Sequence, residues 1–317
     1  MMTVSFNTSA LEPTREACEA LDSWGVNYSV TEDGTVFVPG KLDISNRELT
    51  KLPDLTCVSV GGNFDCHGNL LTSLEGAPKS VAGEFYCPHN RLTSLKGAPR
   101  SVGGSLWCNN NQLASLEHAP QAVGGGFYCN DNLLTSLEHG PRQVGGGYFC
   151  YKNRLTSLEH MPQQPINGDF HCTDNRLQSL KWAPPSVTGN FWCSDNELTS
   201  LEHAPRSVGE RFNCENNHLA SLMHGPDTVG LYVFCSGNPL TTLEGAPRVF
   251  KKLKTPFGNF QTWDEVPEEL RLSPETRARQ LDDIVQGSTV LQSPVTVGKS
   301  FRFRNRAGFC RHGRASR

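Results

Sequence analysis

Twelve cysteines are the residues of this chain with the most obvious capacity for chemistry, and nine of them recur at a nearly fixed spacing. Neighbours in this series are 21 residues apart, with one step of 22, at Cys66, Cys87, Cys108, Cys129, Cys150, Cys172, Cys193, Cys214 and Cys235. Zinc sites usually contain C-x-x-C pairs, whereas each unit here reads C-x-x-N, so no metal site is predicted. Parallel cysteines would have side-by-side Cβ vectors, so disulfides stay open but are not predicted. The recurring thiols are interpreted as small apolar core residues.

A second recurring group is a row of histidines, most of them beside a glutamate. They stand ten residues after the cysteine, at His118, His139, His160, His203 and His224. Such a row could sense protons or bind a metal, but a histidine ladder on a solvated edge is ordinary. The sequence also lacks a phosphate-binding loop, a G-x-S-x-G motif and a paired metal motif. We therefore expect a protein that is not an enzyme and that uses no cofactor.

The residue before each cysteine is aromatic in six of the nine units. Because side chains alternate along a strand, this row should lie on the outer face of a sheet whose inner face holds the cysteines. Exposed aromatic rings mark interaction surfaces, since a partner removes their apolar area from water. The alternative is that the rings only stabilise neighbouring strands by stacking. The predicted binding residues are Tyr86, Trp107, Tyr128, Phe149, His171 and Trp192, with Tyr151 and Glu215 in the row after the cysteine.

The elements that must position these residues follow from the repeat, which reads V-x-G-x-F-x-C-x-x-N-x-L-x-x-L-x-x-x-P. Only the F-x-C segment has the period of two expected of a strand, so each unit is predicted to be a short strand within an irregular coil. The phenylalanine, cysteine, valine and two leucines should point inward, where neighbouring coils cover them. The asparagine amide should pair with backbone groups that the turn leaves free, and stacked copies should form a polar ladder.

The stretch from Leu42 to Leu55 is a tenth, degenerate unit with Arg47 at the asparagine position. The pattern resembles the leucine-rich repeat, with phenylalanine and cysteine in place of the two strand leucines. The stretch "LTSL…P…F-x-C-x-N-N" is similar to short-repeat proteins among type III secreted effectors and phage or prophage proteins, over about residues 42–250. The resemblance implies an α+β solenoid with one long parallel sheet of about ten short strands. In such horseshoes the outer face of the sheet is concave.

The segments on either side of the repeats are predicted to cap the solenoid. Residues 1–41 should form an N-terminal cap with a helix over "PTREACEALDSWG" and a hairpin around "TEDG". Residues 251–298 should form a helical C-terminal cap, in which Ser273 is the N-cap and Leu281, Ile284 and Val285 face inward. Residues 299–317 are a basic tail.

The tail is the main departure from an otherwise balanced charge of -3. It follows the last acidic residue, Asp283, and is predicted to contact an acidic protein surface through Arg302, Arg304, Arg306 and Arg311. Nucleic acid is the less favoured partner, because the tail has no fold that reads bases.

The overall interpretation is a non-catalytic protein-binding module with an unnamed protein partner, phage-encoded or host-interacting. One alternative is a structural component of a phage or another assembly. Another is an effector with ubiquitin-ligase-like activity, although only 67 residues follow Phe250 and Cys310 is their one cysteine. The chain has neither a membrane span nor the basic start and apolar middle of a Sec signal. We expect it in the bacterial cytoplasm or in a virion.

Overall fold

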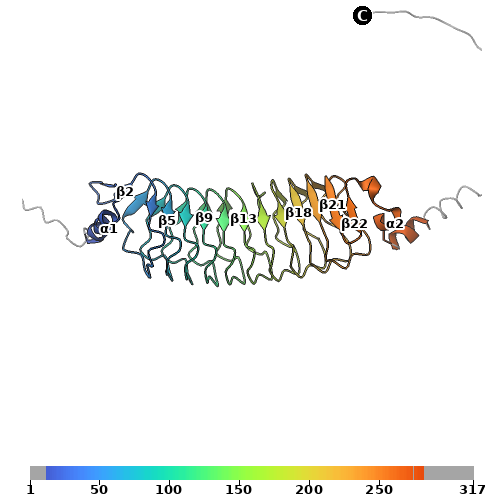
Figure 1. The fold of residues 1–317 in the computed structure, drawn as a ribbon, viewed down its shortest axis with the longest axis horizontal. Helices are drawn as coiled ribbons and strands as arrows, with labels where there is room; N and C mark the ends of the chain where they lie inside the picture. The colour runs from blue at the N-terminus through green and yellow to red at the C-terminus, as the bar shows by residue number, and fades with distance from the viewer. Residues whose placement is uncertain (1–11, 274, 282–317) are drawn as a thin grey trace, which may run out of the picture. The chain divides into compact units, whose positions relative to one another are not determined.

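The computed structural model describes residues 12–273 and 275–281. The chain divides into two compact units, Met1–Ser273 and Pro274–Arg317. The first unit contains all of the repeats, stacked side by side as successive coils (Figure 1). In the second unit the described residues, 275–281, are helical.

The main sheet of the first unit has twelve short strands, one for each of the ten repeat units and two in the closing hairpin. All neighbours are parallel and in register except the last pair, which is antiparallel. The strands are β3 (Leu42–Asp43), β5 (Phe64–Asp65), β7 (Phe85–Tyr86), β9 (Leu106–Trp107), β11 (Phe127–Tyr128), β13 (Tyr148–Phe149), β14 (Phe170–His171), β16 (Phe191–Trp192), β18 (Arg211–Asn213), β20 (Tyr232–Phe234), β21 (Lys252–Thr255) and β22 (Gly258–Phe260). The predicted parallel solenoid is therefore confirmed.

A second row of strands starts at the predicted N-terminal hairpin and runs through the segment that follows the proline of each repeat, where the sequence analysis predicts no strand. It forms a seven-stranded sheet of β1 (Ser29–Val30), β2 (Val36–Val38), β4 (Val58–Val60), β6 (Ser80–Val81), β8 (Ser101–Val102), β10 (Ala122–Val123) and β12 (Gln143–Val144). A three-stranded sheet follows, with β15 (Ser186–Val187), β17 (Ser207–Val208) and β19 (Thr228–Val229). Two-residue strands are too short to show a period, so only the stacking of coils reveals them.

The second row is interrupted at the unit that carries the one extra residue of the repeat. Within the described chain, no backbone hydrogen bond links residues 142–146 to residues 163–168, although both neighbouring sheets are regular. Pro165 lies in this stretch and has no N–H to donate. The main sheet continues past the same point, with the Tyr148 N–H donating to Asp169 O at 2.8 Å.

The core is a stack of identical layers, each closed only by the layers beside it. Phe85, Cys87, Leu92 and Leu95 are fully buried, and their equivalents in the other coils are buried in the same way. Burial raises the pKa of the Cys129 thiol well above its ordinary value, so the thiol stays protonated. Several thiols also act as weak donors, for example Cys87 Sγ to Trp107 O at 3.1 Å. The nine cysteines of the repeat are free thiols.

The predicted asparagine ladder is present, and each member joins two coils. Asn132 Nδ2 donates to Cys108 O at 3.0 Å and to Cys129 O at 3.1 Å, while its Oδ1 accepts the Leu113 N–H at 3.0 Å. In the degenerate first unit the Arg47 N–H donates to Asn69 Oδ1 at 2.9 Å. The backbone of each coil is thereby satisfied by the coil that follows it.

The N-terminal end of the stack carries the predicted helix and hairpin. Helix α1 (Glu12–Ser23) buries Ala17 and Leu21 completely, and the next turn ends at Gly25, whose φ is 65°. Strands β1 and β2 form an antiparallel hairpin, and β2 pairs with β4 to join the second row. The helix thus covers the apolar layer that the first coil would expose.

The C-terminal end differs from the purely helical cap that the sequence predicts. The β21–β22 hairpin extends the main sheet, and the 3-10 helix Trp263–Glu265 and the short helix α2 (Glu268–Arg271) follow. Leu281, predicted to face inward, belongs to the second unit, so its packing against the repeats stays a prediction. Ile284, Val285 and the residues 299–317 lie outside the described residues.

Replacing Cys129 with serine should lower the free energy of unfolding by about 1–3 kcal/mol, because a hydroxyl in this apolar slot loses its hydrogen bonds to water. Cys129→Ala is the matched control, since it has nearly the same reduced volume but adds no polar group. Urea unfolding followed by circular dichroism would compare the three proteins. A serine variant no less stable than the alanine variant would show that the slot tolerates polarity.

Candidate functional site

The outward row of the main sheet is the strongest candidate for a binding surface. Tyr86, Trp107, Tyr128, Phe149 and Trp192 are half-buried, on the face of the sheet opposite the buried core residues, and His171 shares this position. Their strands are in register, so equivalent side chains stand directly beside one another. The sequence places the row correctly but predicts free exposure, whereas each side chain is partly covered by its neighbours.

Four rings of the row form one continuous stack. The ring centroids of Tyr86 and Trp107 are 5.3 Å apart, those of Trp107 and Tyr128 are 3.5 Å apart, and those of Tyr128 and Phe149 are 4.4 Å apart. The planes of each pair lie within 8° of parallel. Past Phe149 the order changes, because the His171 ring meets Trp192 edge-on at 87° and 4.6 Å. The stack thus spans β7 to β13.

Two glycines leave room for rings of this stack to lean along their own strands. A Cβ atom at Gly126 would lie 2.9 Å from Cε2 of Tyr128, and one at Gly147 would lie 2.7 Å from Cε2 of Phe149. These glycines stand two residues before their aromatic residues, on the same outward side of the strand. Any larger residue there would push the rings off the surface.

The row is uncharged at neutral pH, because burial disfavours every charged form. Burial and a hydrogen bond to Glu84 raise the pKa of Tyr86 to about 12. Burial also raises the pKa of Tyr128, and it lowers the pKa of His171 to about 4 despite the nearby Asp169 carboxylate. The surface therefore offers a partner apolar and aromatic contact rather than charge.

The two residues predicted in the row after the cysteine behave differently. The Tyr151 ring stacks on His171, with centroids 4.2 Å apart and an angle of 28° between the planes. It therefore extends the aromatic surface sideways. Glu215 is half-buried in the coil of β18, and it adds a carboxylate rather than a ring to this face. The arginines predicted to make tail contacts, Arg302, Arg304, Arg306 and Arg311, lie outside the described residues.

The histidine row has a conformational explanation. His118, His139, His160, His203 and His224 all have φ between 63° and 71°. The equivalent residues in other coils are Gly76, Gly97 and Gly245, which have φ of 84° to 95°, and Trp182, which has φ of 73°. Histidine is enriched over most other residues in this left-handed region. Within the described residues, no group of three or more acidic, histidine or cysteine side chains could hold a metal ion.

A basic and aromatic pocket at the C-terminal end of the main sheet was not predicted. It has a volume of about 240 Å³ and is lined by Tyr232, Phe234, Lys252 and Lys254. Tyr232 could have been predicted to face outward, because side chains alternate along a strand and it stands two residues before Phe234. The lysines could not, because β21 follows the last repeat and carries none of its pattern.

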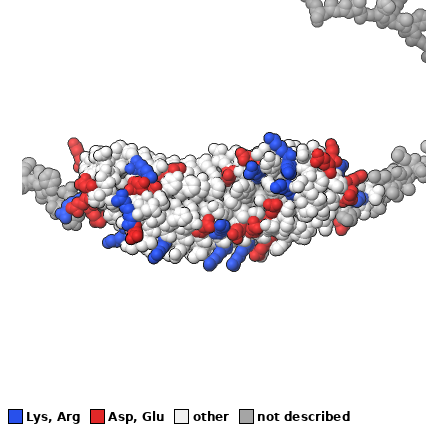
Figure 2. All heavy atoms as spheres, in the orientation of Figure 1, with Lys and Arg blue, Asp and Glu red and all other residues white. Residues whose placement is uncertain are grey.

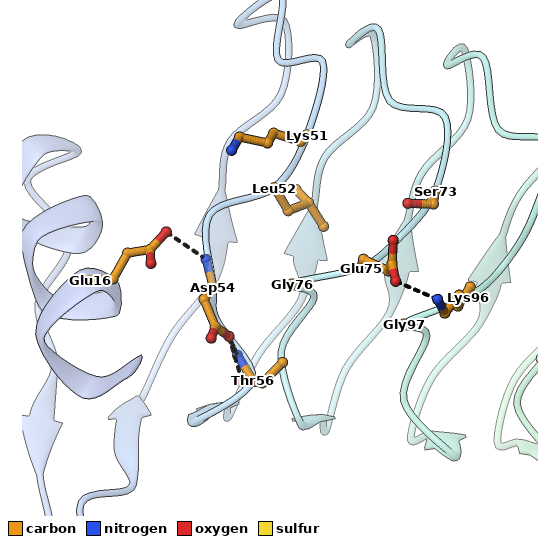
Figure 3. A pocket seen from close by; sticks show the side chains of 10 residues that line it. All are labelled: Glu16, Lys51, Leu52, Asp54, Thr56, Ser73, Glu75, Gly76, Lys96 and Gly97. Atoms are coloured by element: carbon orange, nitrogen blue, oxygen red, sulfur yellow. Dashed lines mark hydrogen bonds and ion pairs between the residues drawn. The ribbon is translucent and has the colours of Figure 1, made fainter. Parts of the chain in front are cut away.

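Another hollow lies at the other end of the repeats, with a volume of about 580 Å³. Several of its charged groups already have partners, as Figure 3 shows: Glu16 accepts the Asp54 N–H at 3.2 Å, and Lys96 lies 2.7 Å from Glu75. Gly76 and Gly97 line its floor. The Glu16–Asp54 contact ties α1 to the first coil, and the Lys96–Glu75 pair joins two neighbouring coils. We therefore interpret the hollow as part of the contact between the N-terminal cap and the repeats.

Charge elsewhere is mixed. On the face drawn in Figure 2, positive and negative side chains alternate in small groups rather than forming one patch. No helix within the described ranges is long and apolar enough to cross a membrane.

No protein-family model and no curated protein matches this chain. Among solved structures, YopM, a leucine-rich effector protein from Yersinia pestis, matches with a TM-score of 0.50 and 22% identity, over 76% of this chain and 66% of that one. YopM from Yersinia enterocolitica WA-314 matches with a TM-score of 0.30 and 19% identity, over 68% of this chain and 65% of that one. The matched part is just under two thirds of either YopM chain. The first likeness shows the fold, a solenoid of leucine-rich repeats, as the sequence predicts.

Proposed function

We propose that this protein is a non-catalytic module that binds another protein across the outward aromatic row of its main sheet. The observation that carries this proposal is the stack from Tyr86 to Phe149, which presents ring edges and parts of ring faces along four adjacent strands. A partner that covers the stack removes the apolar area of four neutral rings from water.

Trp107 favours binding over a purely structural role for the stack. Its indole Nε1 is buried and has no hydrogen-bond partner among the described residues. A buried donor without a partner costs about 1–3 kcal/mol, which phenylalanine at the same position would avoid. Tryptophan is instead a residue type that often dominates the energy of an interface.

Replacing Trp192 with alanine should abolish capture of the partner, because truncating an interface tryptophan costs roughly 2 kcal/mol or more. Trp107→Ala should do the same but also lower stability by about 1 kcal/mol, since its ring lies between two others. Immobilised wild type and variants would be compared by quantitative mass spectrometry of proteins retained from the host lysate, with thermal unfolding measured in parallel.

The matched control is Trp182→Ala. Trp182 is 39% exposed on the returning segment of its coil, away from the main sheet. Its loss should leave capture unchanged. If Trp192→Ala and Trp107→Ala keep the same retained proteins as the wild type, the row is scaffolding. If the wild type forms higher oligomers in light scattering that the tryptophan variants do not form, the row serves self-assembly instead.

The biological setting belongs to the same proposal. We place the protein in a bacterial host or a phage particle, in a host-interacting role, because its repeats resemble those of phage and secreted repeat proteins. An assembly role and ligase-like activity are the weaker alternatives.

A further inference from the structure

We infer that the pocket at the β20–β21 end of the main sheet is an anchor for a carboxylate side chain on the partner. This inference rests on the proposed binding function and adds the chemistry of one partner segment. The anchor would hold an aspartate or glutamate that is flanked by apolar residues, next to the aromatic surface.

Three unpaired cations make the pocket electropositive. Lys252 and Lys254 line it, and Arg211 stands beside it, in register with Tyr232 on the neighbouring strand. No carboxylate of the described residues forms an ion pair with any of these three side chains, whereas Lys41 and Lys96 on the same unit are both paired. The cations therefore have capacity for an anion from outside.

Aromatic rings hold two of these three cations in place. The Lys254 Nζ lies 5.0 Å from the centroid of the Phe234 ring, and the Arg211 guanidinium lies 5.4 Å from that of Tyr232. The two rings meet edge to face with centroids 6.2 Å apart. Each ring thus gives the pocket an apolar wall and keeps a positive group near its mouth.

Acidic groups elsewhere on the sheet face favour a single carboxylate, rather than a long polyanion, as the ligand of the pocket. Glu84 lies on the outward face at the N-terminal end, Asp169 lies near its middle, and Glu215 lies on the coil beside β20. These carboxylates would repel a nucleic acid strand running along the sheet. A single carboxylate in an otherwise apolar protein segment meets no such repulsion.

The test uses the full chain and a biotinylated hexapeptide, Gly-Phe-Glu-Glu-Phe-Gly amide, on a biosensor surface at low salt. The peptide spans roughly 20 Å, and the sheet spacing puts Trp107 on β9 about 29 Å from β20, so a peptide bound in the pocket cannot reach Trp107. We expect Lys252→Gln/Lys254→Gln to bind the peptide at least tenfold more weakly than the wild type. Lys79→Gln/Arg100→Gln, which removes the same charge from exposed positions on other coils, should bind as the wild type does.

Three results would overturn the inference. The first is equal binding by the lysine variant, and the second is equal binding of the matched peptide with glutamine in place of glutamate. The third is stronger, lysine-dependent binding of an oligothymidylate, which would assign the pocket to nucleic acid. Peptide binding that survives Trp107→Ala supports the anchor even where the aromatic row proves not to bind protein, so failure of either proposal is seen separately.

Discussion

Leu137→Asp should unfold several neighbouring coils together. The Leu137 side chain is 1% exposed, and its layer is closed only by the layers on either side. An aspartate there buries a charge without a partner, which places it among substitutions that cost more than about 4–5 kcal/mol. In a stack of repeats the loss of one layer also removes the interfaces with both neighbours.

Hydrogen exchange followed by mass spectrometry would show the extent of this unfolding coil by coil. The control is Leu133→Asp in the same coil, where the leucine is 37% exposed and the new carboxylate stays in water. It should change protection little. Loss of protection confined to the coil of Leu137 would contradict the shared-layer account.

Asn132→Ala should lower the free energy of unfolding by about 3 kcal/mol or more. The change leaves the Leu113 N–H without its acceptor. It also removes the hydrogen bonds to Cys108 O and Cys129 O, worth about 1 kcal/mol each, although these carbonyls keep donors from Asn111 and Asn153. Each buried polar group left without a partner costs about 1–3 kcal/mol. Alanine cannot replace these bonds, and the ladder position is only 6% exposed, so water cannot readily do so.

Equilibrium unfolding in urea would measure this loss. Asn167→Ala is the control, because Asn167 is exposed and its amide makes one contact, at 3.4 Å from Thr188 Oγ1. It should stay within about 0.5 kcal/mol of the wild type. Equal stability of the two variants would mean that the ladder does not hold the coils together.

The parts of this fold that the sequence predicts are those repeated in every coil. The spacing of Cys129 and Asn132 fixes the inward strand and the ladder, because the same environment must recur at each step. The αL turn before the ladder is also readable, since Asn110, Asp131 and equivalent residues favour positive φ.

The parts that escape prediction depend on contacts between coils or lie beyond the repeat. The second row of strands forms only when the segment of Val81 meets that of Val102. The stacked position of the Tyr128 ring requires a glycine two residues before it. This requirement can be recognised only once both residues are known to lie on the same face of a strand. The pocket lysines, Lys252 and Lys254, belong to a strand that the repeat does not encode.

The interruption of the second row near Pro165 has a mechanical meaning. Elsewhere two sets of strands link neighbouring coils, but here only the main sheet and the asparagine ladder do so, without the second row. We therefore expect bending stiffness to be lowest between β13 and β14. The aromatic stack, on β7 to β13, and the pocket, on β20 and β21, lie on opposite sides of this compliant joint. The angle between the two surfaces can adjust to a curved or flat partner without breaking the sheet that carries both.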